Sequence, residues 1–240
     1  FLLSLGALIR KNKPTRVLVV FDGKGGSTRR KKMYKGYKHG RKGLTKVNRL
    51  AGYEDLEDQQ QSMKNQFVSV IKYLELLPVD LCYIDYVEAD DIMAYAARHI
   101  FKKEVLIVSS DKDFLQLVDD RISVYQPTKK KMVYKDDVKE LFGVPSHNLV
   151  FYRIFDGDKS DNIPGVRGVG PKTLVNKLLF LQNENLDMDT LMESVSELDD
   201  EKLKKKILDN KDILDLNYRL MQLSDPEISS SIKSNVRNII

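Results

Sequence analysis

The sequence has 240 residues, enough for one large domain or for a domain with a smaller appendage. Hydrophobic residues make up 42% of it and charged residues 31%, as in a folded globular protein, and no run of about 18 uninterrupted apolar residues occurs, which excludes a membrane-spanning helix. The single cysteine, Cys82, excludes a disulfide within the chain and fits a reducing compartment, so we expect a cytoplasmic protein.

The net charge of +5 is unevenly distributed along the chain. Residues 23–53 hold eleven lysines or arginines and no acid, whereas the rest of the chain holds 29 basic and 35 acidic residues. Tyr34, Lys35 and Tyr37 illustrate how aromatic and basic side chains alternate here, a composition suited to phosphate contacts and to stacking on unpaired bases. A solvated loop is the alternative interpretation. The position of this segment directly after the acidic residue Asp22 favours a nucleic-acid interface.

The expected elements alternate between helices and strands in the first half of the chain. Apolar patterning predicts helices over residues 1–12, 56–77, 92–100 and 114–118, buried parallel strands over 16–21, 81–84 and 105–108, and a peripheral strand pair over 122–125 and 132–134. We expect the first helix to be an ordinary core helix and the second to pack one apolar face on the sheet. This alternation predicts a three-layer α/β domain with a mostly parallel sheet. After about residue 136, helices and loops predominate.

Acidic residues follow three of the predicted strands at the point where each strand ends. They are Asp22 after the first strand, Glu88, Asp90 and Asp91 after the second, and Asp111 and Asp113 after the third. Because the carboxyl ends of parallel strands lie side by side, we expect these acids to converge. Converging carboxylates repel one another unless a cation neutralises them, and oxygen ligands without Cys or His indicate Mg²⁺ or Mn²⁺. Helix capping is the alternative interpretation, which explains single acids better than three clusters.

A glycine-rich segment lies in the second half of the chain. Its glycines are Gly165, Gly168 and Gly170, and Pro171, Lys172 and Thr173 follow them. The segment superficially resembles a nucleotide-binding P-loop, but the extra proline spoils the spacing and the preceding segment is not a strand. We therefore predict a tight turn between two helices, at about residues 155–180. Backbone N–H groups at the start of the second helix would hold a DNA phosphate there.

Five motifs, in order along the chain, resemble the 5′ nucleases, a family that includes the amino-terminal domain of bacterial DNA polymerase I, phage 5′-to-3′ exonucleases and flap endonucleases. The motifs are Lys13-Pro14-Thr15 with Val19-Val20-Phe21-Asp22, Tyr37-Lys38 with Arg41, Val87-Glu88-Ala89-Asp90-Asp91, Ser110-Asp111-Lys112-Asp113, and Gly157-Asp158-Lys159-Ser160-Asp161-Asn162-Ile163-Pro164-Gly165. The bacterial and phage branch fits better than the eukaryotic one. The resemblance implies a PIN-like or resolvase-like α/β domain over residues 1–135 with a helical arch at about 23–55. A helical DNA-binding subdomain of helix-hairpin-helix type would follow over residues 136–240.

The resemblance also implies an activity, namely a structure-specific 5′-to-3′ exonuclease or flap endonuclease that cuts DNA at junctions between a 5′ single strand and a duplex, in replication and repair. By motif, Asp22, Glu88, Asp90 and Asp91 would bind a first divalent ion, and Asp111, Asp113, Asp158 and Asp161 a second. Lys38 and Arg41 would steer the scissile phosphate, supported by Arg29 and Arg30. The turn from Gly165 to Thr173 would grip the downstream duplex, with a K⁺ ion bound there.

Three alternatives remain open from the sequence. Family members begin with a strand that ends in an acidic metal ligand, whereas this sequence begins in the helix after it, so we expect an upstream part to be missing from this chain. A forked-DNA-binding module without catalysis is therefore the second hypothesis, and a nuclease that removes RNA primers from hybrids with DNA is the third. In each case we expect a monomer in the cytoplasm of a bacterium or a phage-infected cell.

Overall fold

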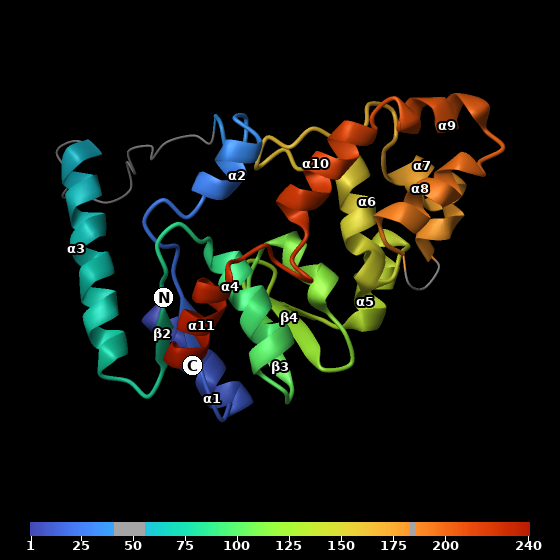
Figure 1. Cartoon of the computed structure of the whole chain (residues 1–240). Helices are drawn as coiled ribbons and strands as arrows, with labels where there is room; N and C mark the ends of the chain where they lie inside the picture. Colours follow the sequence, from blue (N-terminus) through green and yellow to red (C-terminus); the bar gives the residue numbers. More distant parts are fainter. Residues whose placement is uncertain (41–55, 183–185) are drawn as a thin grey trace.

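The protein is described by a computed structural model in which residues 1–40, 56–182 and 186–240 are placed (Figure 1). The second part of the predicted arch, including Arg41, lies outside the described residues. No helix in the described part of the chain is both long and apolar enough to cross a membrane.

The first half of the chain folds in the predicted alternation. Its elements are α1 (Leu2–Asn12), β1 (Leu18–Val20), α2 (Thr28–Met33), α3 (Leu56–Glu75), β2 (Asp80–Cys82), α4 (Ala89–Tyr95), the π-helical turn η1 (Ala96–Ile100), β3 (Val105–Val108), the 3₁₀ helix η2 (Lys112–Leu117), β4 (Ile122–Gln126) and β5 (Lys131–Val133). The second half is helical. Its elements are α5 (Lys135–Phe142), η3 (Ser146–Asn148), α6 (Leu149–Asp156), α7 (Pro171–Lys177), η4 (Leu179–Gln182), α8 (Met188–Ser196), α9 (Glu201–Leu208), α10 (Lys211–Met221) and α11 (Ser230–Ile239).

The strands form two hydrogen-bonded groups in the described residues. β1 pairs with β2 in parallel, and β4 pairs in parallel with β3 and antiparallel with β5. The predicted class, an α/β domain followed by a helical region, is confirmed. The strand pair predicted at 122–125 and 132–134 also forms, as β4 and β5, and its orientation is antiparallel. α4 joins the two groups because its opposite faces enter different cores: Ile92 packs beside Cys82, whereas Ala94 packs in the cluster that contains Ile107.

One prediction of helix burial is wrong and a second holds only in part. α1 forms as predicted, but none of its residues is buried, and Leu3 is 90% exposed. α3 also forms, and part of its apolar face packs as predicted, since Leu74 is fully buried and the Phe67 ring lies 5.2 Å from that of Phe21, yet Phe67 is still 51% exposed. α3 stands beside the body of the molecule in Figure 1. Amphipathic spacing predicts that a helix forms, whereas burial depends on which surface faces it.

One core continues from the strands into the helical region. Ile107 and Val124 of the second strand group share a cluster with Ile154 of α6, Leu174 of α7 and Leu214 of α10. This shared packing fixes the end of α6 relative to the end of β3, where two of the predicted acidic motifs lie.

The last helix returns to the first strand group. Ile228 and Val236 pack in the cluster with Cys82, and Figure 1 places α11 beside β2 although nearly 150 residues separate them in the chain. The connection from α10 to α11 passes close to the start of the arch, where Arg29 donates to Glu227, and to η2, where the Gln116 side chain accepts from the Leu223 N–H. The sequence offered no indication of this return.

Candidate active site

Asp22 lies just beyond β1, beside the start of α4. Its Oδ1 accepts a hydrogen bond from the backbone N–H of Ala89 at 2.8 Å. Gly23 allows this close approach, because a Cβ there would lie 1.8 Å from the carbonyl oxygen of Ile84. The ends of β1 and β2 thus meet at one point, as the acidic motifs predicted.

Glu88 occupies the position before the first turn of α4 and is buried. Its carboxylate is ion-paired with the Arg30 guanidinium and with the Lys38 ammonium group, and the Tyr37 hydroxyl lies 3.3 Å from Oε2. Burial opposes ionisation, but the charges of Arg30 and Lys38 outweigh it and hold the pKa of Glu88 below its usual value. Lys38 has a left-handed backbone conformation with φ of 56°.

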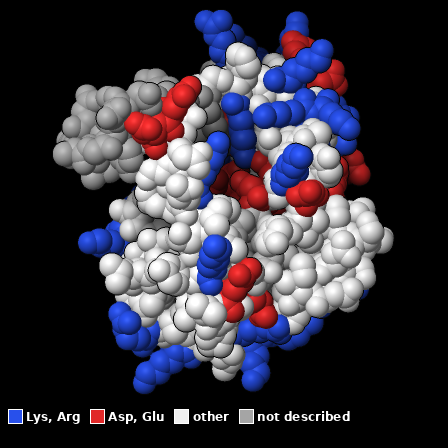
Figure 2. Space-filling view, turned by 90° about the vertical axis from the view of Figure 1, so that its left-hand side faces the viewer, with Lys and Arg blue, Asp and Glu red and all other residues white. Residues whose placement is uncertain are grey.

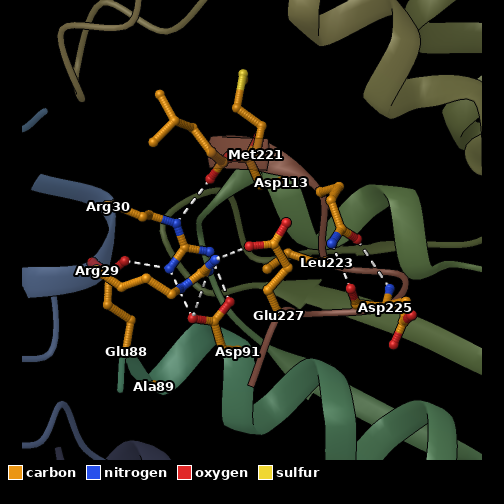
Figure 3. Close-up of polar contacts among 12 residues, drawn as sticks. Arg29, Arg30, Glu88, Ala89, Asp91, Asp113, Met221, Leu223, Asp225 and Glu227 are labelled. Carbon is orange, nitrogen blue, oxygen red and sulfur yellow. Dashed lines mark hydrogen bonds and ion pairs between the residues drawn. The ribbon is translucent and has the colours of Figure 1, made fainter. Parts of the chain in front are cut away.

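Asp91 is held by the arginine pair that begins the arch (Figure 3). Arg30 donates to both oxygens of Asp91, at 2.8 and 2.7 Å, and its Nε donates to the carbonyl of Leu220 at 2.8 Å. Arg29 lies 3.5 Å from Asp91 and 3.1 Å from Glu227. Arg30 is only 4% exposed, and the Asp91 and Glu88 charges raise its pKa although burial opposes this. Arg30 therefore holds Glu88 and Asp91 in place and is not exposed to solvent.

Asp90, which follows β2, and Asp111, which follows β3, are electrostatic neighbours. Asp90 lies in the first turn of α4 and is half-buried. Burial and the neighbouring Asp111 carboxylate raise the pKa of Asp90 to about 7. Asp111 precedes η2, and one of its oxygens accepts from the backbone N–H of Asp113 at 2.8 Å, so the capping interpretation is correct for this bond. Neighbouring carboxylates of this kind are the donor set that a hard divalent cation neutralises.

Arg153 of α6 forms ion pairs with two further acids, Asp113 after β3 and Asp158 after α6. Its Nε donates to Asp113 at 3.0 Å and its Nη2 to Asp158 at 2.5 Å. Burial raises the pKa of Asp113 to about 7 despite Arg153, with Asp111 and Asp158 adding to the rise. Burial also opposes ionisation of Asp158, but hydrogen bonds from Ser160 and the charge of Arg153 hold the pKa of Asp158 below its usual value.

The turn after α6 carries Asp158 and Asp161 to the base of the arch. Asp158 pairs with Ile163 through two backbone hydrogen bonds, of 2.9 and 2.7 Å. The carbonyl of Asp161 accepts from the Lys38 N–H at 2.8 Å, and the Asn162 side chain donates to the carbonyl of Gly36 at 2.9 Å. Segments about 120 residues apart in the sequence therefore meet here, and both carry residues of the predicted site.

The glycine-rich turn connects α6 and α7, as predicted. Gly157 has φ of 75°, and a Cβ there would lie 2.4 Å from the Gly165 nitrogen, so both crowding and conformation require glycine. Gly168 also has a positive φ, of 79°. Gly170 precedes α7, in which Lys172 is exposed and Thr173 half-buried. Contacts of this turn with DNA remain predictions.

The sequence-based prediction missed Arg153 and placed Tyr37 in the wrong environment. Arg153 was overlooked, although a single cation within the apolar run of α6 is a typical sign of a buried ion pair. Tyr37 was expected to stack on bases, but it is buried and its hydroxyl contacts Glu88, so its ring offers no stacking surface in this arrangement. Lys35 is exposed, and its contact with DNA stays a prediction.

The acids of the predicted site form a row of electrostatic neighbours: Asp22 lies beside the start of α4, Asp111 acts on Asp90, and Asp111 and Asp158 act on Asp113. In Figure 2, acidic side chains lie in a hollow of the surface with basic side chains around it. Within the described residues, no three His, Cys, Asp or Glu side chains are placed to hold a metal ion together. Several of these carboxylates are instead paired with Arg30, Lys38 or Arg153. The donor set itself is all oxygen, and the Asp111 charge raises the pKa of Asp90, which fits a site for a hard divalent cation.

Comparison with known proteins decides the family. Residues 1–143 match the profile described as "5'-3' exonuclease, N-terminal resolvase-like domain", and residues 144–236 match "5'-3' exonuclease, C-terminal SAM fold". The chain belongs to the 5′-3′ exonuclease family. The resemblance that the five motifs indicated is therefore confirmed.

Three curated relatives show how the chain relates to this 5′-3′ exonuclease family. A 5′-3′ exonuclease of Aquifex aeolicus is 36% identical over 180 residues, which are 74% of this chain and 57% of the relative. DNA polymerase I of Rhizobium leguminosarum is 34% identical over 88% of this chain but only 19% of its own length. The flap endonuclease Xni of Pseudoalteromonas translucida is 31% identical over 94% of this chain and 80% of the relative. The chain thus spans little more than half of the first relative and about a fifth of the second.

Solved structures support the same fold. The T5 D15 protein co-crystallised with metal ions has a TM-score of 0.76 over 99% of this chain and 89% of that protein, at 21% identity. A likeness at this identity confirms the resolvase-like and helical architecture.

Proposed function

We propose that this chain is a structure-specific 5′ nuclease, which hydrolyses phosphodiester bonds of DNA where a 5′ single strand meets a duplex. The observation that carries the proposal is the row of acids at the strand ends, which faces the basic start of the arch. Family membership supports hydrolysis, and relatives named flap endonuclease support a branched DNA substrate. A T5 D15 flap endonuclease was solved with DNA and metal ions.

Two divalent ions, Mg²⁺ or Mn²⁺, complete the proposed site. Asp22, Glu88, Asp90 and Asp91 are the proposed residues for the first ion, and Asp111, Asp113, Asp158 and Asp161 those for the second. When bound, such ions supply a water of lowered pKa and stabilise the leaving oxygen. The family relationship makes a divalent ion reasonable, because structures of the T5 5′-exonuclease contain divalent metal ions.

The basic residues of the chain have separate tasks in this proposal. The Lys38 ammonium group is ion-paired with Glu88 and is 18% exposed, and the Lys38 backbone N–H donates to the Asp161 carbonyl, so this lysine lies among the acids and still reaches solvent. Its positive charge would offset the charge that develops on the phosphate, a task that Arg41 would share. Arg30 keeps Glu88 and Asp91 in place, while Arg29 and Lys35 would contact the DNA backbone.

The glycine turn completes the proposed DNA interface. The turn from Gly165 to Gly170, with Lys172 and Thr173 at the start of α7, would hold the backbone of the downstream duplex, and a K⁺ ion at its carbonyls belongs to this proposal. Sequence would not be read here, since contacts to phosphates position DNA without specifying bases.

The test is cleavage of an end-labelled duplex with a 5′ flap, in Mg²⁺ and in EDTA. The proposal predicts Mg²⁺-dependent cuts near the junction, and slow or no cutting of a matched 3′-flap duplex. Equal cutting of both flaps would contradict the structural specificity. Comparing an RNA flap with a DNA flap of the same sequence decides between the flap and RNA-primer hypotheses.

A forked-DNA-binding module without catalysis is the second candidate. One observation favours it: Glu88, Asp91, Asp113 and Asp158 are all paired with basic side chains of the chain itself. This hypothesis predicts tight binding of the forked DNA in Mg²⁺ with no products.

A further inference from the structure

Arg153 is a buried cation in a helix that is otherwise almost entirely apolar. Its neighbours in α6, from Leu149 to Phe155, are buried, and its own side chain is only 7% exposed. An arginine in such a position destabilises the fold unless its charge is paired and its N–H groups are satisfied. Arg153 has no task in the proposed function, so its burial and its pairing need an explanation.

The guanidinium bridges two acids that come from different parts of the fold. Asp113 follows β3 in the α/β region, and Asp158 follows α6 in the helical region. Separate nitrogens serve the two carboxylates, Nε at 3.0 Å and Nη2 at 2.5 Å, and Nη1 lies 3.4 Å from the carbonyl of Gly157. Without the bridge, two carboxylates in a partly buried site would repel each other.

The backbone beside Arg153 is fixed by a buried side chain of α10. The buried side chain of Asn217 in α10 donates to the carbonyl of Ile154 at 2.9 Å and to that of Pro164 at 2.7 Å. These bonds clamp both ends of the turn that carries Asp158. The backbone on both sides of the turn is therefore fixed, while the guanidinium itself is held by the two acids and the Gly157 carbonyl.

We propose that Arg153 is a positioning residue, which holds Asp113 and Asp158 together so that they are placed for the second divalent ion before the ion binds. It uses one oxygen of Asp113 and one of Asp158. This inference rests on the proposed function, because the second ion is part of that proposal. Arg153 touches neither the substrate nor the reacting atoms.

The planar guanidinium suits this task in a way that an ammonium group does not. Arginine presents several N–H groups in a fixed fork and can serve two carboxylates from two edges, whereas lysine is a single point charge on a flexible stem. Arg153→Lys should therefore restore charge neutrality without restoring the geometry. If Arg153 served only as a positive charge, lysine would replace it fully. If Arg153 bridges two carboxylates, lysine would not.

The test is calorimetric titration of the full chain with Mn²⁺ alone, without DNA. The wild type should bind two ions, and Arg153→Gln should weaken the second by at least about tenfold while the first is unchanged, the effect typical of groups that orient metal ligands. Arg153→Lys should bind the second ion with intermediate affinity. Arg121→Gln is the matched control: Arg121 caps the carbonyls of Ala97, Phe101 and Lys103 away from the acids, so Mn²⁺ binding should stay at the wild-type level.

The outcomes separate the two proposals. If the wild type binds no Mn²⁺, the two-ion part of the proposed function fails. If the wild type binds two ions and Arg153→Gln or Arg153→Lys binds both with wild-type affinity, the positioning role is overturned. Thermal melts establish that each variant is folded, and if Arg153→Gln does not fold, Arg153→Lys carries the test.

Discussion

Replacing Arg30 with glutamine should destabilise the protein by about 3 kcal/mol. Arg30 is 4% exposed and donates to Glu88, to both oxygens of Asp91 and to the Leu220 carbonyl. Removing one partner of a buried ion pair costs about 3–5 kcal/mol, because the other charge is left uncompensated. We expect the lower end of this range, since Lys38 still neutralises Glu88 and Arg29 lies 3.5 Å from Asp91.

Urea unfolding measures this loss directly. With a slope of about 3 kcal/mol per molar for a chain of this size, the midpoint should fall by about 1 M. The pKa of Glu88 is below its usual value in the folded chain, so its contribution to stability is present above that usual value and is lost as the pH falls. The difference between Arg30→Gln and the wild type should therefore shrink below about pH 4.

A control variant makes the Arg30 prediction refutable. Arg16→Gln is the control, since Arg16 is 45% exposed in its pair with Asp80 and exposed pairs contribute less than about 1 kcal/mol. A loss below about 1 kcal/mol for Arg30→Gln, or a loss that does not change with pH, would refute the reasoning.

Three other predictions follow from the site. Because the pKa values of Asp90 and Asp113 are raised to about 7, protons compete with the ion, so Mn²⁺ affinity measured by calorimetry should fall as the pH is lowered through 7. Gly157→Ala should lower the free energy of unfolding in urea by about 2 kcal/mol or more and should slow cleavage. Gly168→Ala is the milder control, since a Cβ at residue 168 would meet only the end of a lysine side chain. Lys38→Met should slow single-turnover cleavage about 100-fold with little change in DNA binding, and an unchanged rate would remove Lys38 from the proposed mechanism.

The strand ends could be predicted from the sequence because their determinants are local. A short apolar run gives the strand, and the acid that follows it lies at the carboxyl edge wherever the sheet is parallel. Asp22, Glu88 and Asp111 therefore lie where the pattern predicted. The same argument explains the turn after α6, whose glycines are required by positive φ and by close backbone approach at Gly157.

The pairing of the acids could not be predicted, because it depends on segments far apart in the sequence. Arg30 reaches Asp91 across 61 positions, and Arg153 reaches Asp113 across 40. The spacing of residues along the sequence does not show which residue a buried charge will pair with. The basic run after Asp22 was interpreted as one DNA-binding surface, but its buried members Arg30 and Tyr37 order the acids while Lys35 faces solvent.

Helix burial failed for a related reason. The apolar spacing of α3 predicted a face on the sheet, but the described residues cover mainly the end near Leu74. α11 shows the converse, since its polar sequence gave no indication that Val236 would pack beside Cys82. Both cases depend on which surfaces meet in the fold, which periodicity does not specify.

The central claim is that the protein hydrolyses DNA with divalent ions bound by the row of acids. The most direct test compares the wild type with the Asp90→Asn, Asp111→Asn double variant on a 5′-flap duplex in Mg²⁺. Asp120→Asn is the control, because Asp120 is an 89% exposed acid that pairs only with a lysine among the described contacts. The account predicts metal-dependent cutting by the wild type and the control, and a rate at least about 100-fold lower for the double variant. Cutting by the double variant at the wild-type rate would contradict it.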